Sequence, residues 1–237
     1  MPLEGELIAE LRKQGADFVY FVDISNLAYN QNKGFPVALL FGITLSPAYL
    51  QKIIDTPDYV VDMVRKRQFD QDEFHLKELK TDELADQIAN YIRLKGYAAY
   101  SQSEDNIYLT GFYDLKTKNT PLPHKTIAGM AGLGWIGKHN LLVTPEYGSA
   151  ISICTILTDA PLKTVLFNPA QSKCGSCTVC INSCPVNALK GNSWNSHTSR
   201  DELVDVYHCI TCLKCLAFCP WTLGYIKNGS LGKIDSF

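Results

Sequence analysis

The chain has 237 residues with a formal net charge of −2, and 46% of its residues are hydrophobic. This composition is typical of a globular protein and excludes a largely disordered chain. The small net charge gives no global field that would attract DNA, and no apolar run is long enough to predict a membrane-spanning helix. The first residues lack the basic and apolar leader of a secreted protein, so we expect a cytoplasmic protein without a membrane partner.

The N-terminal two thirds of the chain predict helices and strands in alternation. Helices are expected over residues 3–14, from the cap at Ser46-Pro47, from Thr81 to Gly96, and over residues 124–130. Strands are expected over residues 18–23, 36–44, 97–102 and 106–110. This alternation predicts a layered α/β domain within the α+β class.

The predicted α/β domain is expected to end in a β-hairpin. Residues 140–144 and 149–158 are β-type runs on either side of a turn at Pro145–Gly148. Cys154 stands alone in the second run, where a free cysteine is expected to pack as a small hydrophobe. We therefore predict one domain over residues 1–165 and a second, small domain over residues 166–237, whose tail after Trp221 wraps over it.

Eight of the nine cysteines form two runs of identical spacing, each closed by a proline. The first run is Cys174, Cys177, Cys180 and Cys184, and the second is Cys209, Cys212, Cys215 and Cys219. The spacing C-x2-C-x2-C-x3-C-P is that of bacterial ferredoxins, whose thiolates hold [4Fe–4S] clusters. The sequence therefore predicts a small ferredoxin-type domain with two [4Fe–4S] clusters.

In ferredoxins with two clusters, the fourth cysteine of each run ligates the other cluster. We expect one cluster on Cys174, Cys177, Cys180 and Cys219, and the other on Cys209, Cys212, Cys215 and Cys184. Disulfides and zinc are the alternatives. Thiols stay reduced in the cytosol, and zinc sites use paired C-x2-C units instead of triple runs, so the spacing favours clusters. A helix between the two runs is expected to open at Ser199, because Ser199–Glu202 has the pattern of a capping box.

A glycine-rich segment, Gly132–Gly137, matches the pattern G-x-G-x-x-G. A dinucleotide-binding fingerprint needs a strand before it and a long helix after it. Here a helix-like segment precedes the glycines and a β-type segment follows them, so we do not expect a Rossmann site. The glycines indicate a sharp turn or a close approach to a flat ligand.

The surrounding stretch is basic. Residues 115–145 hold four lysines, two histidines and no acidic residue. This is either an ordinary basic loop or a pocket for an anionic cofactor tail, a phosphate or a polynucleotide backbone. His124 is our candidate for a proton donor near neutral pH, and Lys125 is the second candidate.

The segment His124–Lys138 (HKTIAGMAGLGWIGK) resembles the epoxyqueuosine reductase family, as do its continuation 140–149 (NLLVTPEYGS) and residues 156–162 (ILTDAPL). The two cysteine runs and the Cys219-Pro220-Trp221 ending are also similar to that family. The resemblance covers roughly residues 124–225.

The resemblance implies a nitroreductase-like α/β domain that binds base-off cobalamin, or less favourably a flavin. It implies that the two clusters pass single electrons from a donor protein, such as a ferredoxin or flavodoxin, to that cofactor. The residues it implies in or beside the corrinoid site are Gly132, Gly134, Trp135, Gly137, Lys138, Tyr147 and Gly148. His124 or Lys125 would protonate the product.

One segment departs from the family. The family carries a catalytic acid in an Asp-Ser/Thr-Gly-Pro segment, where an ungapped count places Lys118–Pro121 in this chain. The missing acid favours a substrate other than a tRNA nucleoside, so tRNA is the weaker of the two expected partners. The alternative function is an electron-transfer protein that serves a partner protein and holds no cofactor beyond the clusters.

Overall fold

The computed structural model describes residues 2–229, which form two compact units. Among the described residues, unit 1 comprises 2–43, 77–133 and 152–168, and unit 2 comprises 44–76, 134–151 and 169–229. Each unit is assembled from three segments of chain. The predicted domain boundary at residue 165 stays a prediction, and both cysteine runs share a unit with segments from the first half of the chain.

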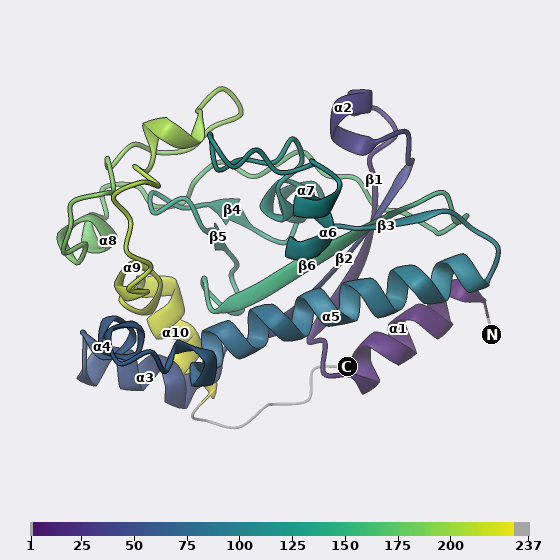
Figure 1. Ribbon diagram of the computed structural model, residues 1–237. Helices are drawn as coiled ribbons and strands as arrows, with labels where there is room; N and C mark the ends of the chain where they lie inside the picture. Colours follow the sequence, from purple (N-terminus) through teal and green to yellow (C-terminus); the bar gives the residue numbers. More distant parts are fainter. Residues whose placement is uncertain (1, 230–237) are drawn as a thin grey trace. The chain divides into compact units, whose positions relative to one another are not determined.

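Unit 1 is built on a four-stranded sheet with the strand order β1-β2-β6-β3 (Figure 1). Its strands are β1 (Phe18–Asp23), β2 (Val37–Thr44), β3 (Ala99–Ser101) and β6 (Ile151–Thr158). Its helices are α1 (Leu3–Lys13), α2 (Tyr29–Asn32), α5 (Glu73–Leu94, from Lys77 on), α6 (Glu104–Leu109) and α7 (His124–Met130). Strands β1 and β2 are antiparallel with Phe21 opposite Leu39, and β3 and β6 are antiparallel with Tyr100 opposite Leu157.

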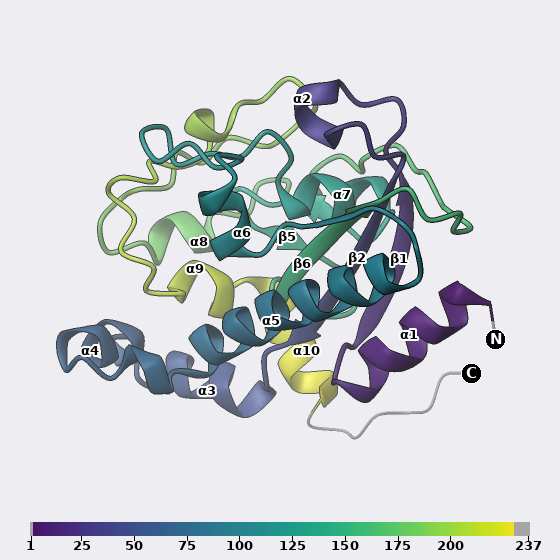
Figure 2. The same ribbon diagram turned by 45° about the vertical axis from the view of Figure 1, so that its right-hand side comes forward.

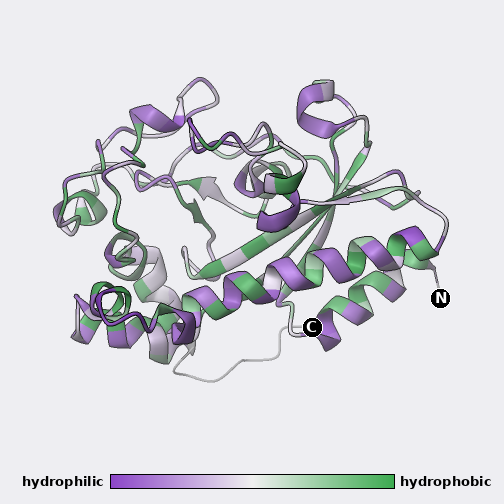
Figure 3. Ribbon diagram, in the orientation of Figure 1, coloured by the Kyte–Doolittle hydropathy of each residue, from purple (hydrophilic) through white to green (hydrophobic). Residues whose placement is uncertain are grey.

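Helices α1 and α5 lie side by side against one face of this sheet (Figures 1 and 2). Side chains alternate between the two faces of a strand, so Leu39 and Phe41 of β2 both face these helices and pack with Leu84 and Ile88 of α5. Figure 3 shows the apolar residues concentrated along β6 and in stripes on both helices. Unit 1 therefore has an ordinary apolar core between a sheet and two amphipathic helices.

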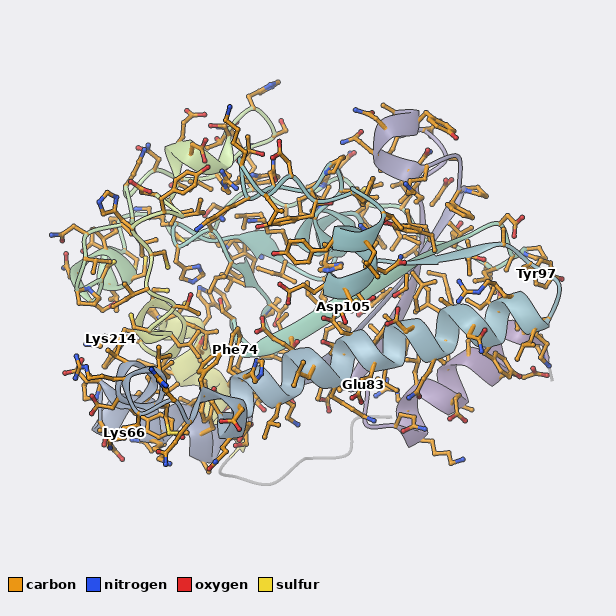
Figure 4. All side chains as sticks on the ribbon, viewed as in Figure 1. Lys66, Phe74, Glu83, Tyr97, Asp105 and Lys214 are labelled. Carbon is orange, nitrogen blue, oxygen red and sulfur yellow. The ribbon has the colours of Figure 1, made fainter. Side chains whose placement is uncertain are left out.

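Unit 2 contains short elements and a two-stranded sheet. Its elements are α3 (Pro47–Asp55), α4 (Tyr59–Arg65), η1 (Phe69–Gln71), β4 (Trp135–Ile136), β5 (Leu142–Val143), α8 (Val179–Asn182), η2 (Arg200–Glu202), α9 (Lys214–Ala217) and α10 (Pro220–Gly229). Buried residues of α3, α9 and α10, among them Leu50, Leu216 and Ile226, form one apolar cluster. An ion pair of 2.8 Å between Lys214 Nζ and Asp58 Oδ1 joins α9 to the residue before α4; Lys214 is labelled in Figure 4.

Several predicted elements are confirmed. Strand β1 has the predicted bounds, β2 is an inner strand of the sheet, and α7 covers residues 124–130. Ser46 caps α3 by accepting a hydrogen bond from Tyr49 N, and the capping box at Ser199 opens η2. These are the places where local sequence signals and tertiary packing agree.

Two predictions in the helical region are wrong. Residues 106–110 belong mostly to helix α6, because Ser103 at the N-cap and the acidic residues Glu104 and Asp105 in the first turn favour a helix start. Helix α5 begins at Glu73 and not at Thr81. The Thr81 hydroxyl bonds to Glu78 O within the helix and to Ser152 Oγ of β6, so this residue faces the sheet in place of capping a helix.

The predicted β-hairpin over residues 140–158 is also wrong. Strand β5 pairs with β4, while β6 joins the four-stranded sheet, and only a bridge between Thr144 and Gly148 closes the turn between them. Strand partners depend on residues distant in sequence, which a local pattern does not contain. The chain after Trp221 continues as helix α10 up to Gly229, and the rest of the predicted tail, residues 230–237, lies outside the described residues.

Candidate iron–sulfur site

The first predicted quartet of cysteines surrounds one cavity in unit 2. The cavity measures about 110 Å³ and is lined by Lys138, His139, Lys173, Cys174, Cys177, Cys180, Cys219, Pro220 and Trp221. Three of its cysteines come from the first run and one from the second. Burial, together with the nearby thiols of Cys174, Cys219 and Cys177, raises the pKa of Cys180 to about 11. The structure thus brings these four cysteines together in the predicted exchanged combination.

The second predicted quartet also lies in unit 2. Burial raises the pKa of Cys215, and the neighbouring thiols raise it further; these are Cys212, Cys209, Cys180 and Cys184. The sulfur of Cys184 accepts a hydrogen bond of 3.3 Å from Ala188 N. The neighbours of Cys215 therefore include Cys209 and Cys212 of its own run, and Cys180 and Cys184 of the first run. The role of all eight as cluster ligands stays a prediction.

The donor set and the size of the cavity fit an iron–sulfur cluster. Four thiolates on a single zinc ion at about 2.3 Å would lie within about 4 Å of one another. Among the described residues, no three Cys, His, Asp or Glu side chains converge closely enough to share one metal ion. A cavity of about 110 Å³ is several times the roughly 10–15 Å³ that one water needs. The quartet thus fits a polynuclear group better than a single zinc ion.

The backbone around the cysteines is locally strained. Thr211 and Leu213, between the cysteines of the second run, have φ of 50° and 58°, and Gly175 in the first run has φ of 51°. A positive φ is a genuine outlier for a β-branched residue such as Thr211. Such strain persists where the surroundings over-determine the backbone and is frequent at functional sites. Thr211 and Leu213 therefore hold a backbone conformation that their local propensity disfavours.

The glycine-rich segment has packing reasons for its glycines. A Cβ on Gly134 would lie 2.0 Å from Val143 O, and one on Gly137 would lie 2.7 Å from His139 Cε1. The two glycines therefore allow the tight β4–β5 hairpin, which carries Lys138 and His139 to the cysteine cavity. Gly132 lies in unit 1 with φ of 72°, where a Cβ would meet the ring of Phe167 at 3.0 Å.

Tyr147 and Gly148 pack against helix α10. The rings of Tyr147 and Tyr225 meet edge to face at 5.8 Å. Gly148 has φ of 57°, and a Cβ there would lie 2.4 Å from Thr222 N. These contacts explain the two residues without a ligand, so the contact of either residue, or of the glycine motif, with a corrinoid stays a prediction.

Trp135 lies beside the wall of the cavity. Its ring contacts the edge of Trp221 with a centroid distance of 4.8 Å, and the ammonium of Lys173 lies 5.2 Å from its centroid. Its buried Nε1 has no hydrogen-bond partner within the part of the chain that the structure describes. A buried donor without a partner in a native protein calls for an explanation, such as a bound group or water.

His124 is held in unit 1 in a defined protonation state. The Thr155 hydroxyl donates to Gln102 Oε1 at 2.6 Å, so it accepts the hydrogen bond from His124 Nδ1 at 2.8 Å. Nδ1 therefore carries the proton, and Nε2 carries a lone pair. Burial lowers the pKa of His124 to about 4, so the ring is uncharged at neutral pH. Nε2 is thus a hydrogen-bond acceptor in this state, and the role of His124 as a proton donor stays a prediction. Lys125 follows in the first turn of α7 and is partly buried.

Cys154 packs as expected. It is fully buried in β6, and its sulfur lies 3.6 Å from Asp82 Oδ1. Burial raises the pKa of this thiol well above its usual value, and the carboxylate of Asp82 raises it further. Such a thiol is unreactive because the thiolate is the nucleophile.

Sequence reasoning missed two residues of the cavity wall, His139 and Lys173. His139 Nδ1 accepts a hydrogen bond of 3.2 Å from Leu141 N, and Ser149 Oγ lies 3.3 Å from Nε2. The signals for these residues were the basic stretch 115–145, which contains His139, and the position of Lys173 next to Cys174.

The cysteine-bearing segment defines the class of protein. Residues 173–223 match the 4Fe-4S dicluster domain family. Together with the two cysteine quartets, this match identifies an iron–sulfur protein with a ferredoxin-type domain, as predicted.

The chain is similar in sequence to epoxyqueuosine reductases, which confirms the resemblance. It is 49% identical over 71 residues to the enzyme of Synechococcus sp. strain CC9605, covering 30% of this chain and 22% of that protein. It is 45% identical over 133 residues to the enzyme of Gloeobacter violaceus, covering 49% of this chain and 41% of that protein. The chain thus spans between about a fifth and two fifths of the length of these relatives.

Solved structures show the same fold. The epoxyqueuosine reductase crystallised with a tRNA-Tyr epoxyqueuosine-modified stem loop has a TM-score of 0.53 at 15% identity, covering 94% of this chain and 66% of its own. The catabolic reductive dehalogenase NpRdhA has a TM-score of 0.60 at 18% identity, covering 92% of this chain and 32% of its own. The predicted α+β fold with a two-cluster domain is therefore confirmed. No described helix is both long and apolar enough to cross a membrane.

Proposed function

We propose that this protein is an oxidoreductase of the epoxyqueuosine reductase type. It passes single electrons from two [4Fe–4S] clusters to a corrinoid, or in its place a flavin, for the reduction of a substrate still to be identified. The observation that carries the proposal is the cavity enclosed by three cysteines of one run and the last cysteine of the other. A reducing compartment such as the cytoplasm suits these thiolates, and a ferredoxin or flavodoxin would supply the electrons.

The residues of the chain have distinct tasks in this proposal. The eight thiolates hold the clusters, and the β4–β5 hairpin closes one side of the first cavity. Trp221 and its neighbour Trp135 cover the cavity with apolar surface, which limits access of water and so affects the potential of a cluster. A bound corrinoid or flavin would supply the two-electron chemistry on the substrate.

The oriented imidazole of His124 supports an enzyme over a simple electron carrier. Its Nδ1 proton is fixed by the hydroxyl of Thr155, and that hydroxyl is fixed by Gln102. Because Nδ1 carries the proton, Nε2 keeps a lone pair, which in this proposal accepts a hydrogen bond from a donor group of a cofactor or substrate. An electron carrier whose work is done at its clusters has no need of such a residue.

One observation favours the second candidate, an electron-transfer protein without a further cofactor. Cys209 is exposed, whereas Cys180, Cys212 and Cys219 are buried. An exposed ligand offers a route for electrons to or from a partner protein. If the protein is an enzyme, this route would carry electrons from the donor protein. If it is an electron carrier, the same route would serve both the donor protein and the acceptor protein.

The test begins with iron and sulfide analysis of the anaerobically purified protein. About eight irons per chain are expected; zinc in their place would contradict the proposal. The protein is then titrated anaerobically with cob(II)alamin, and with flavin mononucleotide in parallel, while the EPR and absorbance spectra are followed. Saturable binding with a base-off cobalt signal supports the corrinoid enzyme. Eight irons without binding of either cofactor would favour the electron-transfer protein.

His124 is tested with a tRNA stem loop that carries epoxyqueuosine as the probe substrate. His124→Ala should lower the turnover at least tenfold with eight irons retained, because the variant loses the acceptor at Nε2. The exposed His197→Ala is the matched control. Unchanged turnover in the His124 variant would remove this residue from the mechanism.

A further inference from the structure

The side chain of Lys138 ends at the loop that carries the first two cysteines. Its Nζ donates hydrogen bonds to Gly175 O at 2.8 Å and to Cys177 O at 3.1 Å. It also lines the cavity together with the first cysteine quartet, and the residue is only 8% exposed. The ammonium group therefore lies inside unit 2, beside the thiols and away from bulk water.

The position of Lys138 is built into the β4–β5 hairpin. Gly137, directly before it, has no room for a side chain, because a Cβ would lie 2.9 Å from Val143 Cγ2 as well as close to the ring of His139. After the lysine, Asn140 N bonds back to Gly137 O at 2.8 Å, and Asn140 has φ of 65°. The turn thus fixes the backbone of Lys138, so the side chain starts from a defined position in the hairpin.

The charge of Lys138 is not balanced by a carboxylate. The ion pairs found within residues 2–229 involve other side chains, and the two partners of Lys138 are neutral carbonyls. A buried ammonium is costly unless a negative charge lies nearby. The negative charge available in this cavity is that of the cysteine thiolates and of the group they hold.

We propose that Lys138 is a positioning residue that holds the Cys174–Cys177 loop and raises the reduction potential of the cluster bound by Cys174, Cys177, Cys180 and Cys219. The inference rests on the clusters of the proposed function. When the donor protein is oxidised by one electron and this cluster is reduced by it, the cluster becomes more negative by one charge. A fixed ammonium nearby stabilises the reduced state more than the oxidised one.

Lys173 shows why burial matters. It lines the same cavity and precedes Cys174, but it is exposed, and its ammonium lies over the ring of Trp135. Water and salt screen an exposed charge much more than a buried one. Lys173 should therefore influence the same cluster less than Lys138 does.

The experiment is an EPR-monitored redox titration of the protein with both clusters assembled. It compares Lys138→Met and Lys138→Arg with wild type, and uses Lys173→Met and the exposed Lys66→Met as matched controls; Lys66 follows α4 and is labelled in Figure 4. We expect Lys138→Met to shift the oxidised-to-reduced ratio of one cluster about tenfold toward oxidised, which is 59 mV for a one-electron couple. The second cluster should keep its potential. Lys138→Arg should restore the first potential, Lys173→Met should shift it less, and Lys66→Met should leave both unchanged.

The outcomes separate this inference from the proposed function. Wild-type protein without about eight irons would contradict the clusters themselves. Eight irons with both potentials unchanged in Lys138→Met would overturn the role of Lys138. If Lys138→Met loses about half of its iron, retention of eight irons and of both potentials in Lys138→Arg would support the role. Loss of iron from Lys138→Arg as well would overturn the conclusion that the positive charge of Lys138 is what the cluster requires.

Discussion

The two units of the molecule are stabilised in different ways. Unit 1 has a continuous apolar core in which β2 and β6 pack against α1 and α5. Within residues 2–229, the buried members of the cluster around the first cysteine run of unit 2 are Cys180, Ala188, Leu189 and Val204. The helices beside the cysteines, α8 and α9, have four residues each, too few to be stable by themselves. We predict that thiolate–metal bonds replace apolar burial around the cysteines, as in other small metal-binding domains.

Removal of iron should have the largest effect on the difference in stability between the two units. Treatment with a chelator and a mild oxidant should speed amide hydrogen exchange over residues 174–215 by about 100-fold or more, because folding there depends on the metal. Amides of β2 and β6 should keep their protection, since their core contains no predicted ligand. Equal loss of protection in both units would show that unit 1 also depends on the clusters.

Two cysteine variants sharpen the same contrast. Cys174→Ala should lose about half of the iron and at least 100-fold of the turnover, because one cluster loses a ligand. Cys154→Ala should keep eight irons and lower the free energy of unfolding by about 1 kcal/mol, because it removes one buried sulfur from the core of unit 1. Iron analysis and denaturant unfolding under argon measure both. A drop in iron in Cys154→Ala would contradict the interpretation of Cys154 as a packing residue without a role at the clusters.

Within unit 2, two glycines differ in the space around them. Gly148→Ala should cost about 2–4 kcal/mol, because the new Cβ would meet Thr222 N at 2.4 Å and the backbone has φ of 57°. Gly224→Ala in α10 meets nothing within 4 Å and should stabilise the protein by about 0.5–1 kcal/mol, because alanine favours the helix. Unfolding by urea compares them. Equal effects would contradict the packing of Gly148 against α10.

The smallest effect concerns a carboxyl group in unit 1. Burial raises the pKa of Asp82 to about 6. The folded state thus binds this proton more tightly than the unfolded state, and stability falls as the pH rises from about 4 through 6. Asp82→Asn should therefore gain stability over wild type, and the gain should grow by about 1 kcal/mol between pH 5 and pH 8. Asp70→Asn, at an exposed position, controls for the lost charge. A gain that does not depend on pH would contradict the burial of a charged Asp82.

Much of the candidate site could be predicted from spacing, because a cluster binds cysteines that lie close together in the chain. The eight cysteines and their grouping with an exchanged fourth ligand follow from a pattern of 46 residues. The contacts of Lys138 could not be predicted, because they join residues 37 and 39 positions apart in the sequence. The tautomer of His124 could not be predicted for the same reason, since it depends on burial and on Thr155 in β6.

The sequence by itself determined the class of this protein and the strands and helices with strong local signals, such as β1, α7 and the capped start of α3. Only the tertiary structure decided that β5 pairs with β4 while β6 enters the large sheet, and that the glycine-rich segment forms a hairpin beside the cysteine loop. The physical reason is that capping and metal ligation act between near neighbours in the chain. Strand pairing, burial and the environment of a charge depend on segments that meet only after folding.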